Sequence, residues 1–175
     1  DLASMAIAQK RRVTATTATA EEVLGVDDRV RLAETEQVAR QRILRDLMLS
    51  GVTIIDPAST YIDADVQVGE DCIIYPQTHI QGTTVIASNT KIGPGAVIRD
   101  SRIGPDCIVQ SAVIEDSQLG MAVRVGPFCH IRGNAVLGDY CELGNYAEIK
   151  NSILGPGVKM HHFSYMGDAD IGAAA

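Results

Sequence analysis

Several side chains that can bind anions or move protons gather in the last third of the sequence. Arg132 and Lys150 are 18 residues apart, and Glu148 lies two positions before Lys150. His162 and Tyr165 follow close together. A guanidinium and an ammonium group that face one ligand can bind a phosphate. An imidazole titrates near neutral pH, so His162 could act as a general base.

The same residues allow simpler interpretations. Arg132 and Lys150 could be a solvated charge pair on a flat surface, and a lone His is more often a surface residue than a catalytic one. A shared metal at His161 and His162 is not favoured, because adjacent residues of a strand point to opposite faces. Glu148 could hold the tautomer of His162 and stabilise its cationic form.

A six-residue period of branched apolar residues determines where these side chains lie. It starts near Ile62 and continues to Ile171, with some intervals of five residues. A helix cannot hold such a stripe, since 3.6 residues per turn do not divide six evenly. The glycines that often follow the apolar residue would interrupt an isolated strand. The series continues through Val68, Ile74, Ile80, Ile86, Ile92, Ile98, Ile103, Val109, Ile114, Leu119, Val125, Ile131, Leu137, Leu143, Ile149, Leu154, Met160 and Met166.

A three-sided solenoid explains this period. Each hexapeptide supplies one short strand and one corner, and stacked coils of three hexapeptides bury a continuous apolar column. The length of the repeat region predicts six coils, and the five-residue intervals are expected to be shortened corners. Because Arg132 and Lys150 are one coil apart, we expect them to stack on one face. The predicted fold is a left-handed parallel β-helix of hexapeptide repeats, whose flat sides favour a homotrimer.

The N-terminal region follows other patterns. Residues 2–9 are expected to be the end of a helix, and the β-branched residues 11–17 predict a strand. Thr19 and Glu22 have capping-box spacing, which predicts a short helix. Gly25 is expected to close that helix in a left-handed conformation.

A long helix is predicted to connect the two dissimilar regions. Asp27 or Asp28 can cap its N-terminus, and apolar residues at helical spacing place it at about residues 31–50. Gly51 follows as the expected C-terminal cap.

Charge and composition exclude some partners. The formal net charge is −7, which argues against a nucleic-acid interface, because such an interface needs a basic face. No segment approaches the roughly 20 apolar residues of a membrane span. The four cysteines lack CxxC spacing, so we expect reduced, packed thiols, which favours a cytoplasmic location. They are Cys72, Cys107, Cys129 and Cys141.

The residues around the candidate site resemble a known enzyme family. The similarity rests on Ile131 and Arg132, on residues 143–150 (LGNYAEIK) and on residues 162–172 (HFSYMGDADIG). A separate motif, residues 25–33 (GVDDRVRLA), precedes the predicted long helix. Over essentially its whole length the chain resembles the bacterial bifunctional N-acetylglucosamine-1-phosphate uridyltransferase/glucosamine-1-phosphate acetyltransferases.

The resemblance implies a domain organisation. Residues 1–30 would be the C-terminal remnant, with a short α/β structure, of a Rossmann-like pyrophosphorylase (uridyltransferase) domain. Residues 31–51 would be the linker helix. Residues 52–175 would be the β-helical acetyltransferase domain, incomplete at its C-terminal end, so the acetyl-transfer site is expected to be only partly present.

The resemblance also implies roles for the site residues. Arg132 and Lys150 match the pair that binds the substrate phosphate. His162 matches the catalytic base, which takes a proton from the amino group as that group attacks the thioester. Glu148 matches the orienting partner of this base, and Tyr165 matches a residue that contacts the amino sugar.

The implied ligands are those of UDP-N-acetylglucosamine biosynthesis. Acetyl-CoA would be the co-substrate and glucosamine 1-phosphate the acceptor. In the complete parent enzyme, UTP and N-acetylglucosamine 1-phosphate would react with the help of magnesium. Asp27 falls where the family usually has a magnesium-binding Asn, so an oxygen ligand is retained with a different charge.

Two other functions remain open from the sequence. A γ-class carbonic anhydrase would need three His ligands contributed across a trimer, and the four histidines lack the context for such a set. They are His79, His130, His161 and His162. A non-catalytic trimeric scaffold would need none of the site residues.

Overall fold

The computed structural model describes residues 1–175 and divides them into two compact units, residues 1–38 and 39–175. The first unit contains helix α1 (Leu2–Ala8) and the beginning of helix α2 (Arg29–Leu49). The side chain of Asp1 caps α1 by accepting a hydrogen bond from the backbone N–H of Ser4 at 2.8 Å. Neither helix combines the length and the hydrophobicity that a membrane crossing requires.

The segment between the helices differs from its prediction. Residues 11–17 form no strand, because no second segment pairs with their backbone and a lone strand leaves its hydrogen-bonding groups unpaired. The predicted capping contact does form, since Glu22 Oε2 accepts the backbone N–H of Thr19 at 2.8 Å. It closes only a turn, because a single contact does not offset the cost of helix nucleation. Gly25 does not adopt a positive φ, so the predicted left-handed cap there is wrong.

Both ends of helix α2 follow the capping prediction. Asp28 Oδ1 accepts the backbone N–H of Arg31 at 2.8 Å, so Asp28 rather than Asp27 is the N-terminal cap. At the other end Gly51 has a φ of +98°. The N–H of Gly51 donates to Met48 O at 3.3 Å and the N–H of Val52 donates to Leu47 O at 3.1 Å. This pair of bonds is a Schellman motif, which satisfies the last carbonyl groups of the helix.

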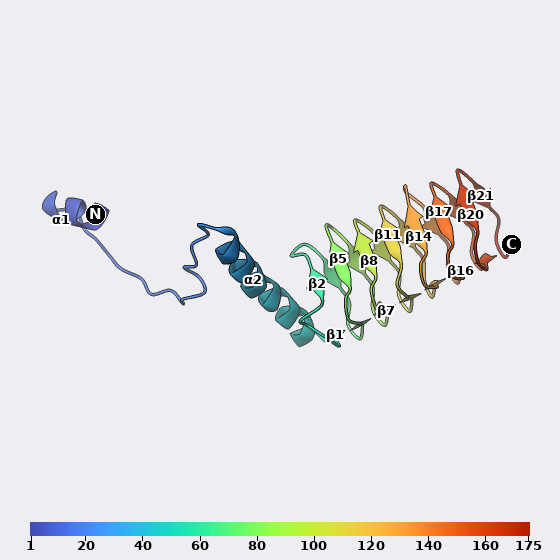
Figure 1. Ribbon diagram of the computed structural model, residues 1–175, viewed down its shortest axis with the longest axis horizontal. Coiled ribbons are helices and arrows are strands. Elements are labelled where there is room, and N and C mark those ends of the chain that lie inside the picture. The colour runs from blue at the N-terminus through green and yellow to red at the C-terminus, as the bar shows by residue number, and fades with distance from the viewer. The chain divides into compact units, whose positions relative to one another are not determined.

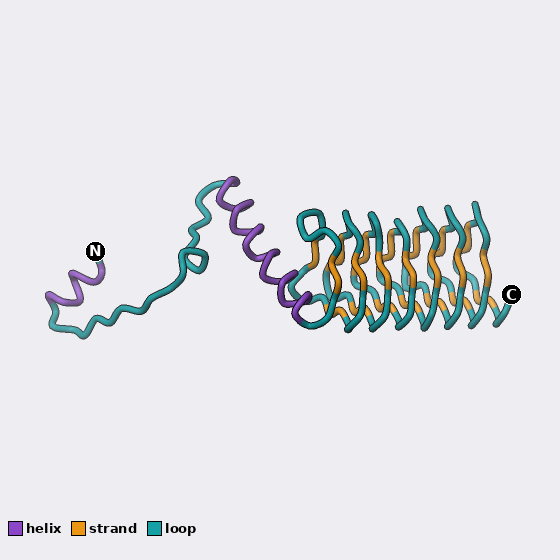
Figure 2. The backbone as a smooth tube through the Cα atoms, turned by 90° about the horizontal axis from the view of Figure 1, so that it is seen from below, coloured by secondary structure: helices purple, strands orange, loops and turns teal.

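The second unit is a solenoid of about seven coils built from three parallel seven-stranded sheets (Figures 1 and 2). The first face consists of β1 (Thr53–Ile54), β4 (Ile73–Ile74), β7 (Lys91–Ile92), β10 (Ile108–Val109), β13 (Arg124–Val125), β16 (Glu142–Leu143) and β19 (Lys159–Met160). The second face consists of β2 (Tyr61–Ile62), β5 (His79–Gln81), β8 (Val97–Arg99), β11 (Val113–Glu115), β14 (His130–Arg132), β17 (Glu148–Lys150) and β20 (Tyr165–Gly167). The third face consists of β3 (Gln67–Val68), β6 (Val85–Ile86), β9 (Arg102–Ile103), β12 (Gln118–Leu119), β15 (Val136–Leu137), β18 (Ile153–Leu154) and β21 (Asp170–Ile171).

The solenoid begins one strand earlier than the six-residue period predicts. Strand β1 pairs with β4, so Thr53 already belongs to the first face, and the prediction of six coils is wrong. The first corner is longer than the others, because Ile54 and Ile62 are eight residues apart and break the six-residue period. Asp56 stabilises this long corner by accepting hydrogen bonds from the N–H of Ala58 at 3.0 Å and the hydroxyl of Ser59 at 2.6 Å.

The five-residue intervals are shortened corners, as predicted. Only two residues separate β8 from β9, and the first of them, Asp100, has a φ of 46°. Asp116 and Asn151 occupy equivalent corners with φ values of 47° and 45°. Asp and Asn tolerate this left-handed region better than most residues do, which explains their recurrence at the short corners.

Branched apolar side chains fill the interior of the solenoid. Ile74, Ile80, Ile92, Ile98 and Ile149 are fully buried members of one continuous cluster. The C-terminal part of α2 covers the open first coil, where Leu44 is buried against the same cluster. The Arg40 guanidinium also lies 4.3 Å from the centre of the Tyr61 ring, and that ring stacks on His79 at 4.7 Å.

The cysteines are packed, reduced thiols, as predicted. All four are free and buried. Each thiol donates to a backbone carbonyl of a neighbouring coil; the Cys107 and Cys129 thiols, for example, donate to Gly120 O at 3.1 Å and Gly144 O at 2.9 Å. Burial raises the pKa of the Cys107 thiol to about 11.

Replacing Ile98 by Ala should lower the free energy of unfolding by about 2–5 kcal/mol, because it removes apolar contacts and leaves a cavity. Ile153→Ala is the matched control, since Ile153 points outward from β18 and is 52% exposed. We expect the control to change the free energy of unfolding by no more than about 0.5 kcal/mol. Urea unfolding followed by circular dichroism measures both. Equal losses of unfolding free energy in the two variants would contradict the inward orientation of Ile98 and the outward orientation of Ile153.

Cys107 should not react with a thiol reagent at pH 8 unless the chain is unfolded, because the protonated thiol is buried and the thiolate is the nucleophile. The raised pKa stabilises the fold below the ordinary thiol pKa of 9.0, and this contribution is lost as the pH rises towards 11. Mass spectrometry of labelled peptides, with and without urea, measures the reaction. Rapid labelling of the folded chain would contradict a buried thiol.

Candidate functional site

The register between coils brings Arg132 and Lys150 together on the second face. Strands β14 and β17 pair in parallel, with Arg132 opposite Lys150 and His130 opposite Glu148. Adjacent strands of a sheet lie about 4.8 Å apart. The predicted stacking of the two cationic residues, one coil apart, is therefore confirmed.

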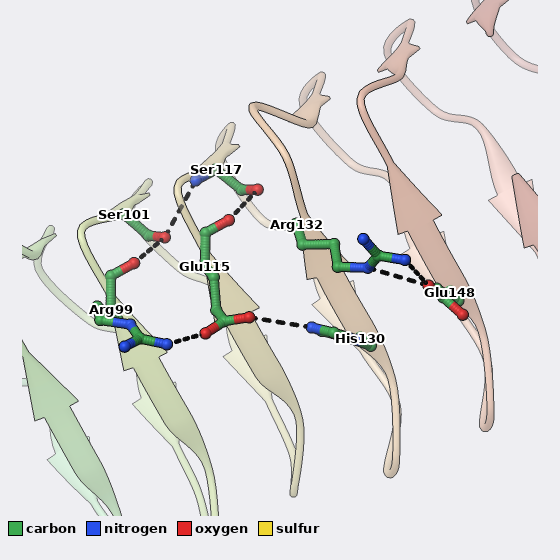
Figure 3. Close-up of polar contacts among 7 residues, drawn as sticks. All are labelled: Arg99, Ser101, Glu115, Ser117, His130, Arg132 and Glu148. Atoms are coloured by element: carbon green, nitrogen blue, oxygen red, sulfur yellow. Dashed lines mark hydrogen bonds and ion pairs between the residues drawn. The ribbon is translucent and has the colours of Figure 1, made fainter. Parts of the chain in front are cut away.

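Glu148 forms an ion pair with one of these cations. Its Oε1 accepts hydrogen bonds from Arg132 Nε at 3.0 Å and from Arg132 Nη2 at 2.7 Å (Figure 3). The two side chains are 37% and 38% exposed. The Lys150 ammonium forms neither a hydrogen bond nor an ion pair. Glu148 thus neutralises Arg132 and leaves Lys150 as an uncompensated cation beside it.

A second polar cluster precedes this pair on the same face. Glu115 binds Arg99 through Oε1, and its Oε2 lies 3.2 Å from Nε2 of His130 (Figure 3). The hydrogen bonds from His130 and from Arg99 lower the pKa of Glu115. Sequence reasoning missed this cluster. The signal was available, because Arg99 and Glu115 both directly follow an inward Ile one shortened coil apart.

Buried serines hold the backbone of these strands in place. The hydroxyls of Ser101 and Ser117 donate to the carbonyls of Arg99 and Glu115, both at 2.7 Å. The Ser117 N–H in turn donates to the Ser101 hydroxyl at 3.1 Å. Ser152 repeats the arrangement after Lys150, with its hydroxyl 2.8 Å from the Lys150 carbonyl. The charged side chains therefore project from a backbone whose polar groups at these corners have hydrogen-bond partners within the chain.

His162 lies at the corner that leads into β20. Its ring packs edge-on against Phe163, with 5.9 Å between the ring centres, and the Ser164 hydroxyl donates to its carbonyl at 3.0 Å. The imidazole has no hydrogen-bond partner. The structure does not bring the Glu148 carboxylate to His162, because that carboxylate is turned towards Arg132 on the preceding coil.

Aromatic side chains surround this corner. Phe128, Tyr146 and Phe163 stack one above another, with ring centres 5.1 Å and 4.9 Å apart. Tyr165 is in register with Glu148 and is 62% exposed, so its side chain is available to a ligand on the second face. The stack was not predicted, although aromatic residues recur there at intervals of about one coil.

Asp27 does not form a metal site with the residues of this chain. It is exposed and precedes the capping residue Asp28. The chain contains no group of three His, Cys, Asp or Glu side chains that could hold a metal ion. A single carboxylate does not fit magnesium, which is bound through several oxygen ligands in octahedral geometry.

Comparison with known proteins identifies the family of this chain. Residues 54–165 match the family described as the GMPPB C-terminal domain. The chain belongs to this family. It is also homologous to curated bacterial proteins named "Bifunctional protein GlmU", which confirms the resemblance drawn from the motifs.

Two of these relatives show the extent of the match. The GlmU of Geobacillus sp. (strain WCH70) is 49% identical over 152 residues, which is 87% of this chain and 33% of that protein. The GlmU of Exiguobacterium sp. (strain ATCC BAA-1283 / AT1b) is 48% identical over 173 residues, which is 98% of this chain and 38% of that protein. The chain thus spans about a third of the length of the relatives it matches.

Solved structures share the solenoid fold. LpxA from Acinetobacter baumannii gives a TM-score of 0.52 at 18% identity, covering 72% of this chain and 64% of that one. The acetyltransferase domain of PglB from Neisseria gonorrhoeae FA1090, solved in complex with acetyl coenzyme A, gives 0.50 at 16% identity, covering 79% and 62%. These likenesses show the fold alone.

Glu115→Gln should reduce the stability of the folded chain at pH 7 by up to about 1 kcal/mol, because it weakens a partly exposed ion pair. The lowered pKa of Glu115 stabilises the fold above the ordinary Glu pKa and ceases to do so as the pH falls through the folded value. The difference between variant and wild type should therefore vanish in acid. Urea unfolding at several pH values measures this difference in stability. A difference that does not change with pH would contradict the stabilising role of the ionised Glu115.

Proposed function

We propose that this chain is the acetyl-transfer part of a bifunctional enzyme of UDP-N-acetylglucosamine biosynthesis. The reaction would be acetyl transfer from acetyl-CoA to the amino group of glucosamine 1-phosphate. The observation that carries the proposal is the register of Arg132 with Lys150, which leaves an uncompensated ammonium on the second face, one coil before the His162 corner. The identity of 42–49% to GlmU proteins supports the same conclusion.

The site residues divide the chemistry between them. Lys150 and Arg132 would bind the phosphate group, since cationic donors suit its charge and geometry. Tyr165 would contact the sugar. His162 would take the proton that the amino nitrogen loses as it attacks the thioester carbonyl; the carbon–sulfur bond then breaks and CoA leaves as the thiolate. Glu148 would stabilise the resulting imidazolium and fix its tautomer.

The remaining features of the parent enzyme belong to the same proposal. Residues 1–30 would be the end of a Rossmann-like uridyltransferase domain, residues 31–51 the linker helix, and residues 52–175 an incomplete left-handed β-helix. That other domain would join UTP to N-acetylglucosamine 1-phosphate with magnesium. The parent would be a cytoplasmic homotrimer.

His162→Ala in the longer protein should lower kcat for acetylation of glucosamine 1-phosphate by about 10²–10⁴-fold, because the general base is lost. His161→Ala is the matched control: the adjacent imidazole lines a different surface, beside Glu142 and Lys159 of the first face, so kcat should stay near the wild-type value. Release of CoA thiol measures the rate. Unchanged acetylation in His162→Ala would exclude His162 as the base and favour a non-catalytic scaffold.

A further inference from the structure

The Glu148 carboxylate has two possible partners, Arg132 and His162. It lies on the middle of three adjacent strands, between β14, which carries Arg132, and β20, which follows His162. Its Oε1 already accepts both donors of Arg132 on the preceding coil (Figure 3). The two neighbouring strands are roughly 10 Å apart, twice the spacing of a sheet. In this arrangement the Glu148 carboxylate is bonded to Arg132 and makes no hydrogen bond to His162.

A phosphate is well suited to displace Glu148 from Arg132. The uncompensated Lys150 is in register with Arg132, so an anion bound there gains a second cation that Glu148 does not use. The Arg132–Glu148 pair is more than one third exposed on both sides. Pairs exposed to this degree contribute little stability, and a phosphate dianion carries more charge than a carboxylate.

The released carboxylate would lie beside His162, whose imidazole has no hydrogen-bond partner. The Glu148 N–H donates to Ser164 O at 2.9 Å, so its backbone already borders the segment that carries His162. The other candidate, His130, is in register with Glu148 but already faces Glu115 Oε2 at 3.2 Å. His162 packs only against Phe163 and has both ring nitrogens free.

We infer that the Glu148 side chain adopts two alternative positions and thereby couples phosphate binding to the orientation of the base, His162. Without ligand Glu148 neutralises Arg132. When the substrate phosphate occupies Arg132 and Lys150, the carboxylate turns to the following coil and accepts a hydrogen bond from the His162 ring. The base is thus assembled only on a loaded site. This inference rests on the proposed function, because it takes the phosphate site and the role of His162 from there.

The first test measures competition, with inorganic phosphate as the probe and the 175-residue chain as the protein. Glu148→Gln removes the competing charge with little change in shape, so it should bind phosphate about fivefold more tightly, the most that a partly exposed ion pair contributes. Glu115→Gln is the matched control, because it removes a carboxylate from the same face that is not bonded to Arg132. Titration calorimetry measures the three affinities. An unchanged or weaker affinity in Glu148→Gln would overturn the inference.

The second test observes the base directly. Nitrogen-15 NMR shifts of the His162 ring, recorded at one fixed pH, report which nitrogen carries the proton and whether it is hydrogen-bonded. Phosphate should move these shifts in the wild type and in Glu115→Gln, but not in Glu148→Gln. Equal movement in all three would mean that phosphate acts on His162 without Glu148 and would overturn the inference.

The outcomes separate this inference from the function on which it rests. Phosphate binding without any response of His162 would overturn the coupling and leave the phosphate site intact. Failure of the wild-type chain to bind phosphate would overturn both the phosphate site and the coupling.

Discussion

Hydrogen bonds between successive coils set the register on which the rest of the structure depends. The N–H groups of Val113, His130 and Glu148 donate to carbonyls one coil further on, at 2.9–3.0 Å. Because this pairing is parallel and in register, a residue's face and height follow from the number of residues in each corner. Residues at the corners adopt a left-handed φ, as Asp100 and Asp116 do at two of the shortened ones. The site residues are therefore placed by backbone geometry, with little contribution from their own side chains.

The electrostatics of the second face follow from that placement. Arg99, Arg132 and Lys150 oppose Glu115 and Glu148, so three cations face two carboxylates within an acidic chain of net charge −7. The ion pairs involve Arg99 with Glu115 and Arg132 with Glu148. The remaining charge is concentrated on Lys150. A local positive site thus coexists with an overall negative protein, and it is small enough to favour a compact anion over an extended polyanion.

The sequence predicts those features that depend on spacing. The six-residue period predicts the solenoid, and the interval from Arg132 to Lys150 predicts their stacking. The same reasoning fails where local geometry decides. The spacing of eight residues between Ile54 and Ile62 hides the first strand from the six-residue pattern, because hydrogen bonds of Asp56 stabilise a longer corner. Whether the Glu148 carboxylate bonds to Arg132 or to His162 depends on side-chain rotamers and on competing charges. The spacing of residues in the sequence does not predict either of these. The strand expected at residues 11–17 fails for a different reason, since a strand needs a partner elsewhere in the chain.

The modular stacking also limits how such a protein can change in length. Each coil contacts only the coils before and after it. Removing one residue from a strand would exchange inward and outward side chains for that segment. Removing or adding an entire coil before β14 would preserve every pairing from β14 to β20. Whole coils are therefore the natural unit of insertion and deletion, and the distance from the helical cap to the charged face can vary while the arrangement of Arg132, Glu148, Lys150 and His162 is inherited intact.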